Sequence, residues 1–124
     1  MKNKFIITNN LIITFSIFFM IITLFTIAAL IPRSLIEYSP PGGDDFMHIY
    51  IFSTLSLLLC FSKILDKKYI YLILFSYGFL IEILQLIVGR NFSYFDILIN
   101  CIGIILGAGI YFCFNKIINL KKNF

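Results

Sequence analysis

The sequence predicts an all-α membrane protein: a polytopic bundle of four transmembrane helices with both chain ends in the cytoplasm. Three observations lead to this fold class: a very apolar composition, four long apolar segments and an uneven distribution of lysines. Hydrophobic residues make up 60% of the 124 residues and charged residues only 13%, whereas a soluble domain carries roughly 25% charged residues. A water-soluble fold of this composition would expose large apolar patches, so the composition excludes a soluble protein.

The four apolar segments have the length that crosses a bilayer. A helix that rises about 1.5 Å per residue needs roughly 20 apolar residues to span a hydrocarbon core about 30 Å thick. The first segment is longer than the apolar part of a signal peptide, roughly 7–15 residues, so we expect it to be a retained helix. No long segment remains for a soluble domain, and residues 1–124 therefore form a single transmembrane domain. The predicted spans cover about residues 11–31, 46–62, 69–88 and 95–114.

The basic residues predict the orientation of these spans. Eight lysines flank the two chain ends and the connection between the second and third spans, while Arg33 and Arg90 lie in the other two connections. Cytoplasmic loops carry the excess of basic residues, so this bias places both termini in the cytoplasm. The formal charge of +4 then reflects topology and contact with anionic lipid headgroups, and we expect no nucleic-acid partner.

Polar and small residues recur at helical spacing in the third and fourth spans. Small residues let two helix backbones approach closely, and polar residues can bond across the gap. We therefore expect the two stripes to face each other or a shared cavity. The third-span stripe consists of Gly78, Glu82, Gln85 and Gly89, and the fourth-span stripe of Asp96, Asn100, Gly103 and Gly107.

The ionisable residues of the spans gather at one depth. Such residues usually face a bundle interior or a water-filled cavity, because exposing them to lipid is costly. The lysine-based topology puts them all in the outer leaflet, together with the polar residues of the stripes. The candidate catalytic residues are His48, Glu82 and Asp96, since a histidine beside a carboxylate can form an acid–base pair. The candidate ligand-binding residues are Asp45, Gln85, Arg90, Ser93 and Asn100.

Each of these residues also has a structural interpretation. Polar side chains can tie a small bundle together without any ligand, and we favour this interpretation for Gln85, Asn100 and the stripe glycines. Ser93 is interpreted first as the N-cap of the fourth helix and second as a ligand contact. For the charged candidates, among them Arg90, whose planar fork suits carboxylate or phosphate, the cost of burying charge favours a function.

We expect no metal and no cofactor. A zinc site needs three or four His, Cys or carboxylate ligands, and the chain has one histidine. Its three cysteines stand singly within apolar spans, where we interpret them as packing residues. A carboxylate site for a divalent cation is left open. The sequence contains no phosphate-binding glycine loop, nucleophile elbow or nucleotide fingerprint.

Two blocks of the sequence resemble the VanZ-like family of membrane proteins. The segment from Asp45 to His48 is similar to the family's Asp-x-x-His element, although the family often has Lys where Phe46 stands. The second block resembles the family in order and spacing, and the resemblance covers about residues 44–110. It implies a bacterial cytoplasmic membrane protein that acts on the cell envelope, in a family named for a protein associated with teicoplanin resistance. The second block comprises Glu82, Gln85, Gly89, Arg90, Ser93, Asp96, Asn100, Gly103 and Gly107.

Three functions remain open at this stage. In the first, an enzyme or binding protein recognises an anionic lipid headgroup or a lipid-linked cell-wall precursor. Arg90 and His48 then hold the anion, while Glu82 and Asp96 transfer protons or orient water. In the second, a non-catalytic accessory subunit uses the polar residues only to fix the bundle. The third, a transporter, is disfavoured because the inner half of the spans is apolar.

Overall fold

The computed structural model describes residues 2–35 and 43–122. All four helices in this part of the chain are long and apolar enough to cross a membrane. These residues contain no strand, and the predicted all-α fold class is confirmed. The elements are α1 (Lys2–Ala29), a short 3-10 turn (Arg33–Leu35), α2 (Gly43–Ser62), α3 (Lys67–Ile87) and α4 (Tyr94–Lys122).

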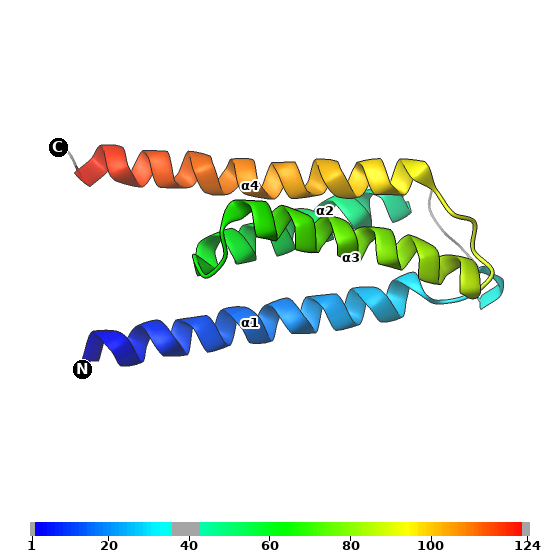
Figure 1. Cartoon of the computed structure of the whole chain (residues 1–124), viewed down its shortest axis with the longest axis horizontal. Coiled ribbons are helices and arrows are strands. Elements are labelled where there is room, and N and C mark those ends of the chain that lie inside the picture. The colour runs from blue at the N-terminus through cyan, green and yellow to red at the C-terminus, as the bar shows by residue number, and fades with distance from the viewer. Residues whose placement is uncertain (1, 36–42, 123–124) are drawn as a thin grey trace.

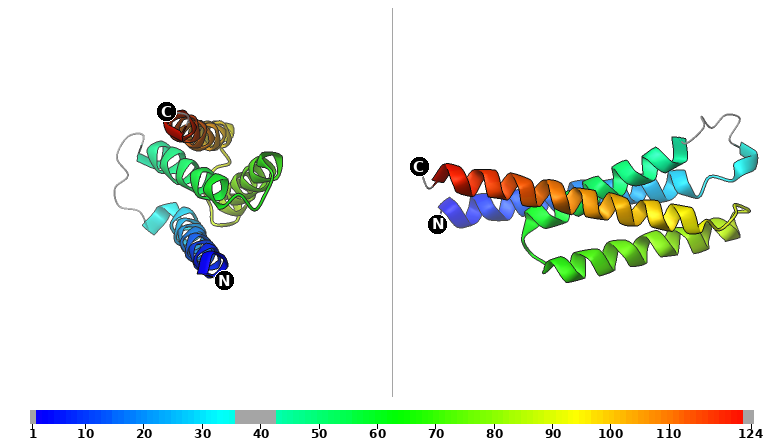
Figure 2. Two further views of the ribbon diagram at one scale, coloured as in Figure 1. Left: turned by 90° about the vertical axis from the view of Figure 1, so that its left-hand side faces the viewer. Right: turned by 90° about the horizontal axis from the view of Figure 1, so that it is seen from above.

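The helices run alternately up and down the bundle (Figures 1 and 2). The start of α1 and the end of α4 lie at the same end of the molecule, which we call the terminus end. At the opposite end, the loop end, α1 and α3 finish while α2 and α4 begin. The two chain ends therefore share one side of the bundle, while the side of the membrane on which they lie stays a prediction.

The helix bounds differ from the predicted spans mainly at the polar ends. α2 begins at Gly43, so Asp44 and Asp45 lie inside its first turn rather than before it, where the helix dipole favours negative charge. α1 stops at Ala29, before the predicted end at residue 31, and α4 continues to Lys122. Hydropathy identifies only the apolar part of a helix. Backbone hydrogen bonds can continue the helix into the polar residues beyond that part. Residues 36–42, which connect the 3-10 turn to α2, lie outside the described part of the chain.

The closest packing joins α4 to α2, which run parallel to each other. A Cβ at Gly103 would lie 2.8 Å from the carbonyl oxygen of Ile49, and one at Gly107 would overlap the carbonyl oxygen of Ser53. Gly103 and Gly107 thus face α2 rather than the third helix, whereas Asn100 of the same stripe lies next to Gly78 of α3. Helical periodicity identifies which face of α4 is buried but not which neighbour covers it.

A hydrogen bond supports the same contact. The Ser56 hydroxyl, fully buried, donates to the Ile104 carbonyl at 2.8 Å. The close approach and this bond together fix the register of α2 against α4, which determines where the side chains of the next turn meet.

The apolar core lies between the site and the terminus end. Phe52, Leu55, Ile70 and Leu74 are almost fully buried among α2, α3 and α4. α1 covers this core with a narrow face and leaves most of its apolar side chains exposed, as expected of a helix that faces lipid. The Tyr77 hydroxyl of α3 donates to the Ile22 carbonyl of α1 at 3.2 Å, which holds α1 against the bundle.

Candidate functional site

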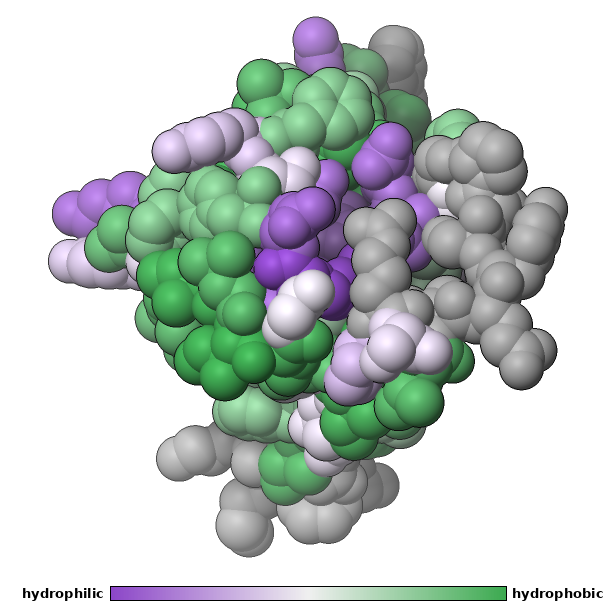
Figure 3. All heavy atoms as spheres, turned by 90° about the vertical axis from the view of Figure 1, so that its right-hand side faces the viewer, coloured by the Kyte–Doolittle hydropathy of each residue, from purple (hydrophilic) through white to green (hydrophobic). Residues whose placement is uncertain are grey.

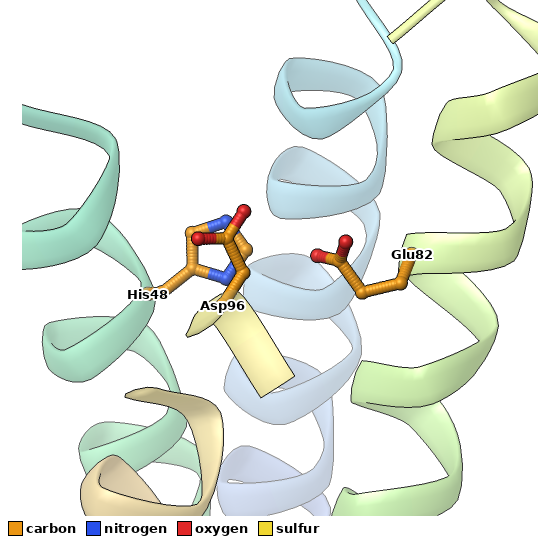
Figure 4. A group of neighbouring side chains, drawn as sticks. All are labelled: His48, Glu82 and Asp96. Atoms are coloured by element: carbon orange, nitrogen blue, oxygen red, sulfur yellow. The ribbon is translucent and has the colours of Figure 1, made fainter. Parts of the chain in front are cut away.

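Three ionisable side chains from three different helices meet near the loop end. His48 comes from α2, Glu82 from α3 and Asp96 from α4, and Figure 4 shows them pointing toward one another. One nitrogen or oxygen atom of each lies within 4.8 Å of those of the other two. His48 is 4% exposed and Glu82 is completely buried. The structure thus brings together the three residues expected to be catalytic, while a catalytic role for them stays a prediction.

Glu82 is held through one of its two carboxylate oxygens. Its Oε2 accepts the backbone N–H of Ser93 at 3.1 Å, and Oε1 is buried with no hydrogen-bond partner among the described residues. The Ser93 hydroxyl in turn accepts the backbone N–H of Asp96 at 3.1 Å, which is the N-cap geometry. Ser93 is therefore the N-cap of α4, as expected. The backbone N–H of this capping residue is the group that donates to Glu82.

His48 is oriented by Asn100 of α4. Its Nδ1 lies 2.8 Å from the Asn100 Oδ1, and because an amide oxygen only accepts, the ring donates from Nδ1. In the neutral ring Nε2 then carries the free lone pair. The rings of Phe25 and Phe52 lie against the imidazole with centroids 5.2 and 6.4 Å away. The polar site is therefore bounded by aromatic side chains.

The position of Asn100 follows from two small residues. Gly103, one turn along α4, allows the close approach to α2 described above. A Cβ at Gly78 of α3 would lie 2.9 Å from the Asn100 Nδ2, so Gly78 leaves room for the amide. That Nδ2 is buried and lacks a hydrogen-bond partner within the described chain.

Arg90 is placed by the end of α3. Gly89 has a φ of +78°, a conformation that glycine adopts without strain. Its N–H donates to the Leu86 carbonyl at 3.2 Å, and that of Arg90 donates to the Gln85 carbonyl at 2.9 Å. These two bonds form a Schellman motif, which ends the helix and turns Arg90 back toward the bundle. Gly89 thus serves the chain turn rather than helix packing.

Arg90 and Gln85 both bind the last residue of α1. The Arg90 Nη1 and the Gln85 Nε2 donate to the Ala29 carbonyl at 3.3 and 3.2 Å. Such carbonyls at a helix C-terminus have no partner within the helix. The Arg90 Nη2 also forms an ion pair with Asp44 at 3.1 Å, and the Arg90 side chain is only 10% exposed. Gln85 therefore has a structural role here, and Arg90 is paired with Asp44 rather than with Glu82 or Asp96.

A small cavity of about 80 Å³ opens beside these residues. His48 and Arg90 both line it, on the side of α1, α2 and α3. Typical small-molecule pockets begin at about 300 Å³, so this cavity fits a charged group rather than a whole ligand. The other lining residues are Phe25, Ala28, Ala29, Asp44, Met47 and Gln85.

Figure 3 looks onto the loop end and shows hydrophilic residues gathered at its centre, with hydrophobic surface around them.

A larger cavity of about 790 Å³ lies elsewhere, between α3 and α4, and contains none of the predicted site residues. Its lining is mostly apolar, with Lys67 and Lys68 among the lining residues.

One predicted residue stays apart from the site. Asp45 is half-buried in the first turn of α2, and in the described chain it takes part in no hydrogen bond or ion pair. Sequence reasoning missed Asp44, although its i, i+4 spacing to His48 puts the two on one helix face. It also missed the Ala29 carbonyl, for which no side chain gives a signal.

Comparison with known proteins identified a family. A family model described as VanZ/LLP1 matches residues 2–115, a range that contains every candidate site residue. Neither the curated proteins nor the solved structures contain a match to the chain.

Proposed function

This chain belongs to the VanZ/LLP1 family, and we propose on this premise that it binds an anionic headgroup at the outer leaflet of the bacterial cytoplasmic membrane. The headgroup is that of a lipid or of a lipid-linked cell-wall precursor. The protein then acts on it by proton transfer, in a cell-envelope role of the kind for which the VanZ-like family is named.

The observation that carries this proposal is the shared cavity of Arg90 and His48. A guanidinium presents several N–H donors in one plane, which suits a phosphate or carboxylate group. Two of these donors are engaged in the described bonds, and the remaining N–H groups are available to an anion. A group bound at Arg90 would lie next to His48.

The second part of the proposal concerns chemistry at that group. His48 belongs both to the cavity lining and to the cluster with Glu82 and Asp96. Its Nε2 can donate or accept a proton, and the unpaired Glu82 Oε1 can accept one from a water or a hydroxyl group. The arrangement supports proton transfer next to the bound anion, with the aromatic rings around His48 limiting access of water.

A second candidate function is a non-catalytic accessory subunit. The observation that favours it is the set of bonds from Arg90 and Gln85 to Ala29, because residues occupied in this way serve the fold. A transporter is not supported, since the buried residues beyond the site toward the terminus end are mainly apolar.

Lipid binding by the purified protein tests the headgroup proposal. The probes are short-chain phosphatidylglycerol and undecaprenyl phosphate, with zwitterionic phosphatidylcholine as the comparison. Arg90→Gln should weaken binding of the anionic probes by about tenfold to a hundredfold, because a hydrogen bond to a charged group is lost. The matched control is Lys68→Gln, which removes an exposed cation from the opposite end of α3 and should leave binding unchanged.

Two further results complete the test. Asp44→Asn should tighten binding of the anionic probes, because it removes the carboxylate that competes for Arg90. A preference for undecaprenyl phosphate over phosphatidylglycerol would identify the cell-wall source. Equal binding of anionic and zwitterionic probes, or equal binding by the parent and Arg90→Gln, would contradict the proposal.

A further inference from the structure

We propose that His48, Glu82 and Asp96 bind a divalent transition-metal ion, Zn²⁺ or Mn²⁺, at the loop end of the bundle. This inference deepens the proposed headgroup site, on which it rests for its biological meaning, because it assigns a cofactor to the same residues. It revises the expectation from sequence that the chain holds no metal.

The donor set has the number and kind of ligands that such an ion requires. One imidazole and two carboxylates converge from three helices, with their ligand atoms within 4.8 Å of one another. Catalytic zinc sites commonly have three protein ligands and an open position. A mixed nitrogen and oxygen set favours Zn²⁺ or Mn²⁺ over Mg²⁺ and Ca²⁺, which prefer oxygen alone. Two ligands on bonds of about 2.1 Å can be at most about 4.2 Å apart, so small side-chain rotations would complete the site.

The unpaired oxygen of Glu82 is a second and independent indication of a ligand. The side chain is fully buried, and its Oε1 has no hydrogen-bond partner within the described residues. Its other oxygen is fixed by Ser93, so the carboxylate is held toward His48 and Asp96 (Figure 4). A buried acceptor without a partner destabilises a fold, and a bound cation would satisfy it.

The partner of His48 has the role of an outer-shell residue at a metal site. A histidine that binds a metal usually donates its other ring N–H to a carboxylate or carbonyl, which fixes the ring. The Asn100 Oδ1 accepts from Nδ1 at 2.8 Å. This bond leaves Nε2 as the ligand atom and determines the direction in which the ring faces.

The charges of the side chains around the site also favour a bound cation. Glu82 and Asp96 lie close together inside membrane-spanning helices, and in the described part of the chain neither forms an ion pair. The nearby guanidinium of Arg90 is paired with Asp44. A divalent ion would neutralise both carboxylates and so remove the repulsion between the buried Glu82 and the half-buried Asp96. When bound, such an ion adds positive charge beside the headgroup cavity and can activate a water molecule. That water would take over the proton transfer assigned above to the His48 Nε2 and the Glu82 Oε1, because these two atoms would bind the ion.

Metal binding is tested on the purified full chain in detergent, stripped with EDTA and without added lipid. Zn²⁺ should bind at one ion per chain and raise the Tm by several degrees at about a hundredfold excess over its Kd. Mg²⁺ at the same concentration should leave the Tm unchanged. Bound metal is measured by elemental analysis after buffer exchange.

Variants assign the ion to the site. Glu82→Gln and Asp96→Asn keep side-chain size and should each weaken Zn²⁺ binding at least tenfold. Asp66→Asn is the matched control, because it removes an exposed carboxylate without a side-chain cap hydrogen bond at the start of α3. Asn100→Ala should lower the affinity by about tenfold to a hundredfold through loss of His48 orientation. If one variant does not fold, the remaining ones decide the assignment.

The inference is overturned if the parent binds neither Zn²⁺ nor Mn²⁺ in this assay, or if Glu82→Gln and Asp96→Asn bind the ion as the parent does. The first result together with intact headgroup binding in EDTA would remove the metal and leave the proposed function standing. Zn²⁺ binding without any headgroup binding would do the reverse.

Discussion

At the scale of single residues, the polar network contains two kinds of atom. The donors of Arg90 and Gln85 that reach Ala29 are satisfied within the bundle, and their removal would loosen the attachment of α1. The Glu82 Oε1 and the Asn100 Nδ2 are buried without described partners. Atoms of the first kind explain stability, whereas atoms of the second kind destabilise the free protein, and the proposed metal ion would supply the missing partner of the Glu82 Oε1.

Glu82→Gln separates these two roles. The amide oxygen of Gln can still accept the Ser93 N–H, and the negative charge near Asp96 disappears. With EDTA present, we therefore expect the variant to insert, to fold and to have a Tm equal to or higher than that of the parent. Its cell-envelope phenotype, measured as sensitivity to a glycopeptide or to membrane stress, should be lost.

Asp96→Asn and His48→Ala should lose the same phenotype. Full activity in all three variants would leave the accessory-subunit function as the remaining explanation of the network. A fall in the Tm of Glu82→Gln by many degrees would instead show that the carboxylate is needed for the fold.

Sequence reasoning found most of the site because its residues have a distinctive chemistry. A charged group in an apolar span has few explanations, so His48, Glu82 and Asp96 could be grouped by depth alone. The partner of Arg90 could not be chosen in this way, since Asp44 and Asp45 are adjacent and differ only in helical phase. The role of the Ala29 carbonyl could not be predicted from the sequence, because every residue has a backbone carbonyl oxygen.

At the scale of elements, the packing of α2 on α4 determines the geometry of the site. Gly103 and Gly107 bring the two backbones together, and the next turn of α4 then carries Asn100 to His48. The sequence predicted the four helices and the small-residue face, because both depend on local spacing. It did not predict that α2 covers this face, since the choice of neighbour depends on the three-dimensional arrangement of the whole bundle.

Two alanine substitutions in α4 test this contact. Gly107→Ala places a methyl group against the backbone of Ser53, and we expect a loss of about 1–3 kcal/mol, as for other overpacked contacts. Gly109→Ala lies two residues away, where a Cβ meets open space. It should stabilise the protein by up to about 1 kcal/mol through helix propensity. Reversible unfolding in mixed micelles measures both.

Disulfide cross-linking gives an independent check. A cysteine pair that replaces Ser56 of α2 and Ile104 of α4, which a hydrogen bond joins, should cross-link more readily than one that replaces Glu82 and Ile104. Equal stability of Gly107→Ala and Gly109→Ala, with no cross-link between α2 and α4, would contradict the observed packing.

At the scale of the whole molecule, the two ends of the bundle carry polar residues of different kinds. Most of the buried polar side chains gather at the loop end (Figure 3), whereas the lysines lie near the chain termini and at the connection between α2 and α3. The lysine bias predicts that the termini lie in the cytoplasm, and the proposed headgroup site would then open toward the outer leaflet. The composition of the spans and the spacing of their polar residues predicted this division. Both are properties of many residues together, so they do not depend on any single contact.

Reporter fusions test the orientation. A reporter that is active only outside the cytoplasm should be silent when fused after Phe124 and active when inserted near Gly42, which lies outside the described residues. Insertion at Asn91, between α3 and α4, should also be active. The opposite pattern would place the site in the inner leaflet and contradict the proposed function.

The attachment of α1 has a consequence for how the protein tolerates mutation. α1 offers α3 the carbonyl oxygens of Ile22 and Ala29, and no amino-acid replacement can delete a backbone oxygen. The exposed residues of α1 are therefore free to change over generations while the segment remains helical and apolar, whereas Phe25, which packs against His48, is not. The length of α1 is not free either, because one inserted residue between these positions would rotate the Ala29 carbonyl by about 100° around the helix axis. Selection on α1 should accordingly act against insertions and deletions far more strongly than against substitutions of its exposed residues.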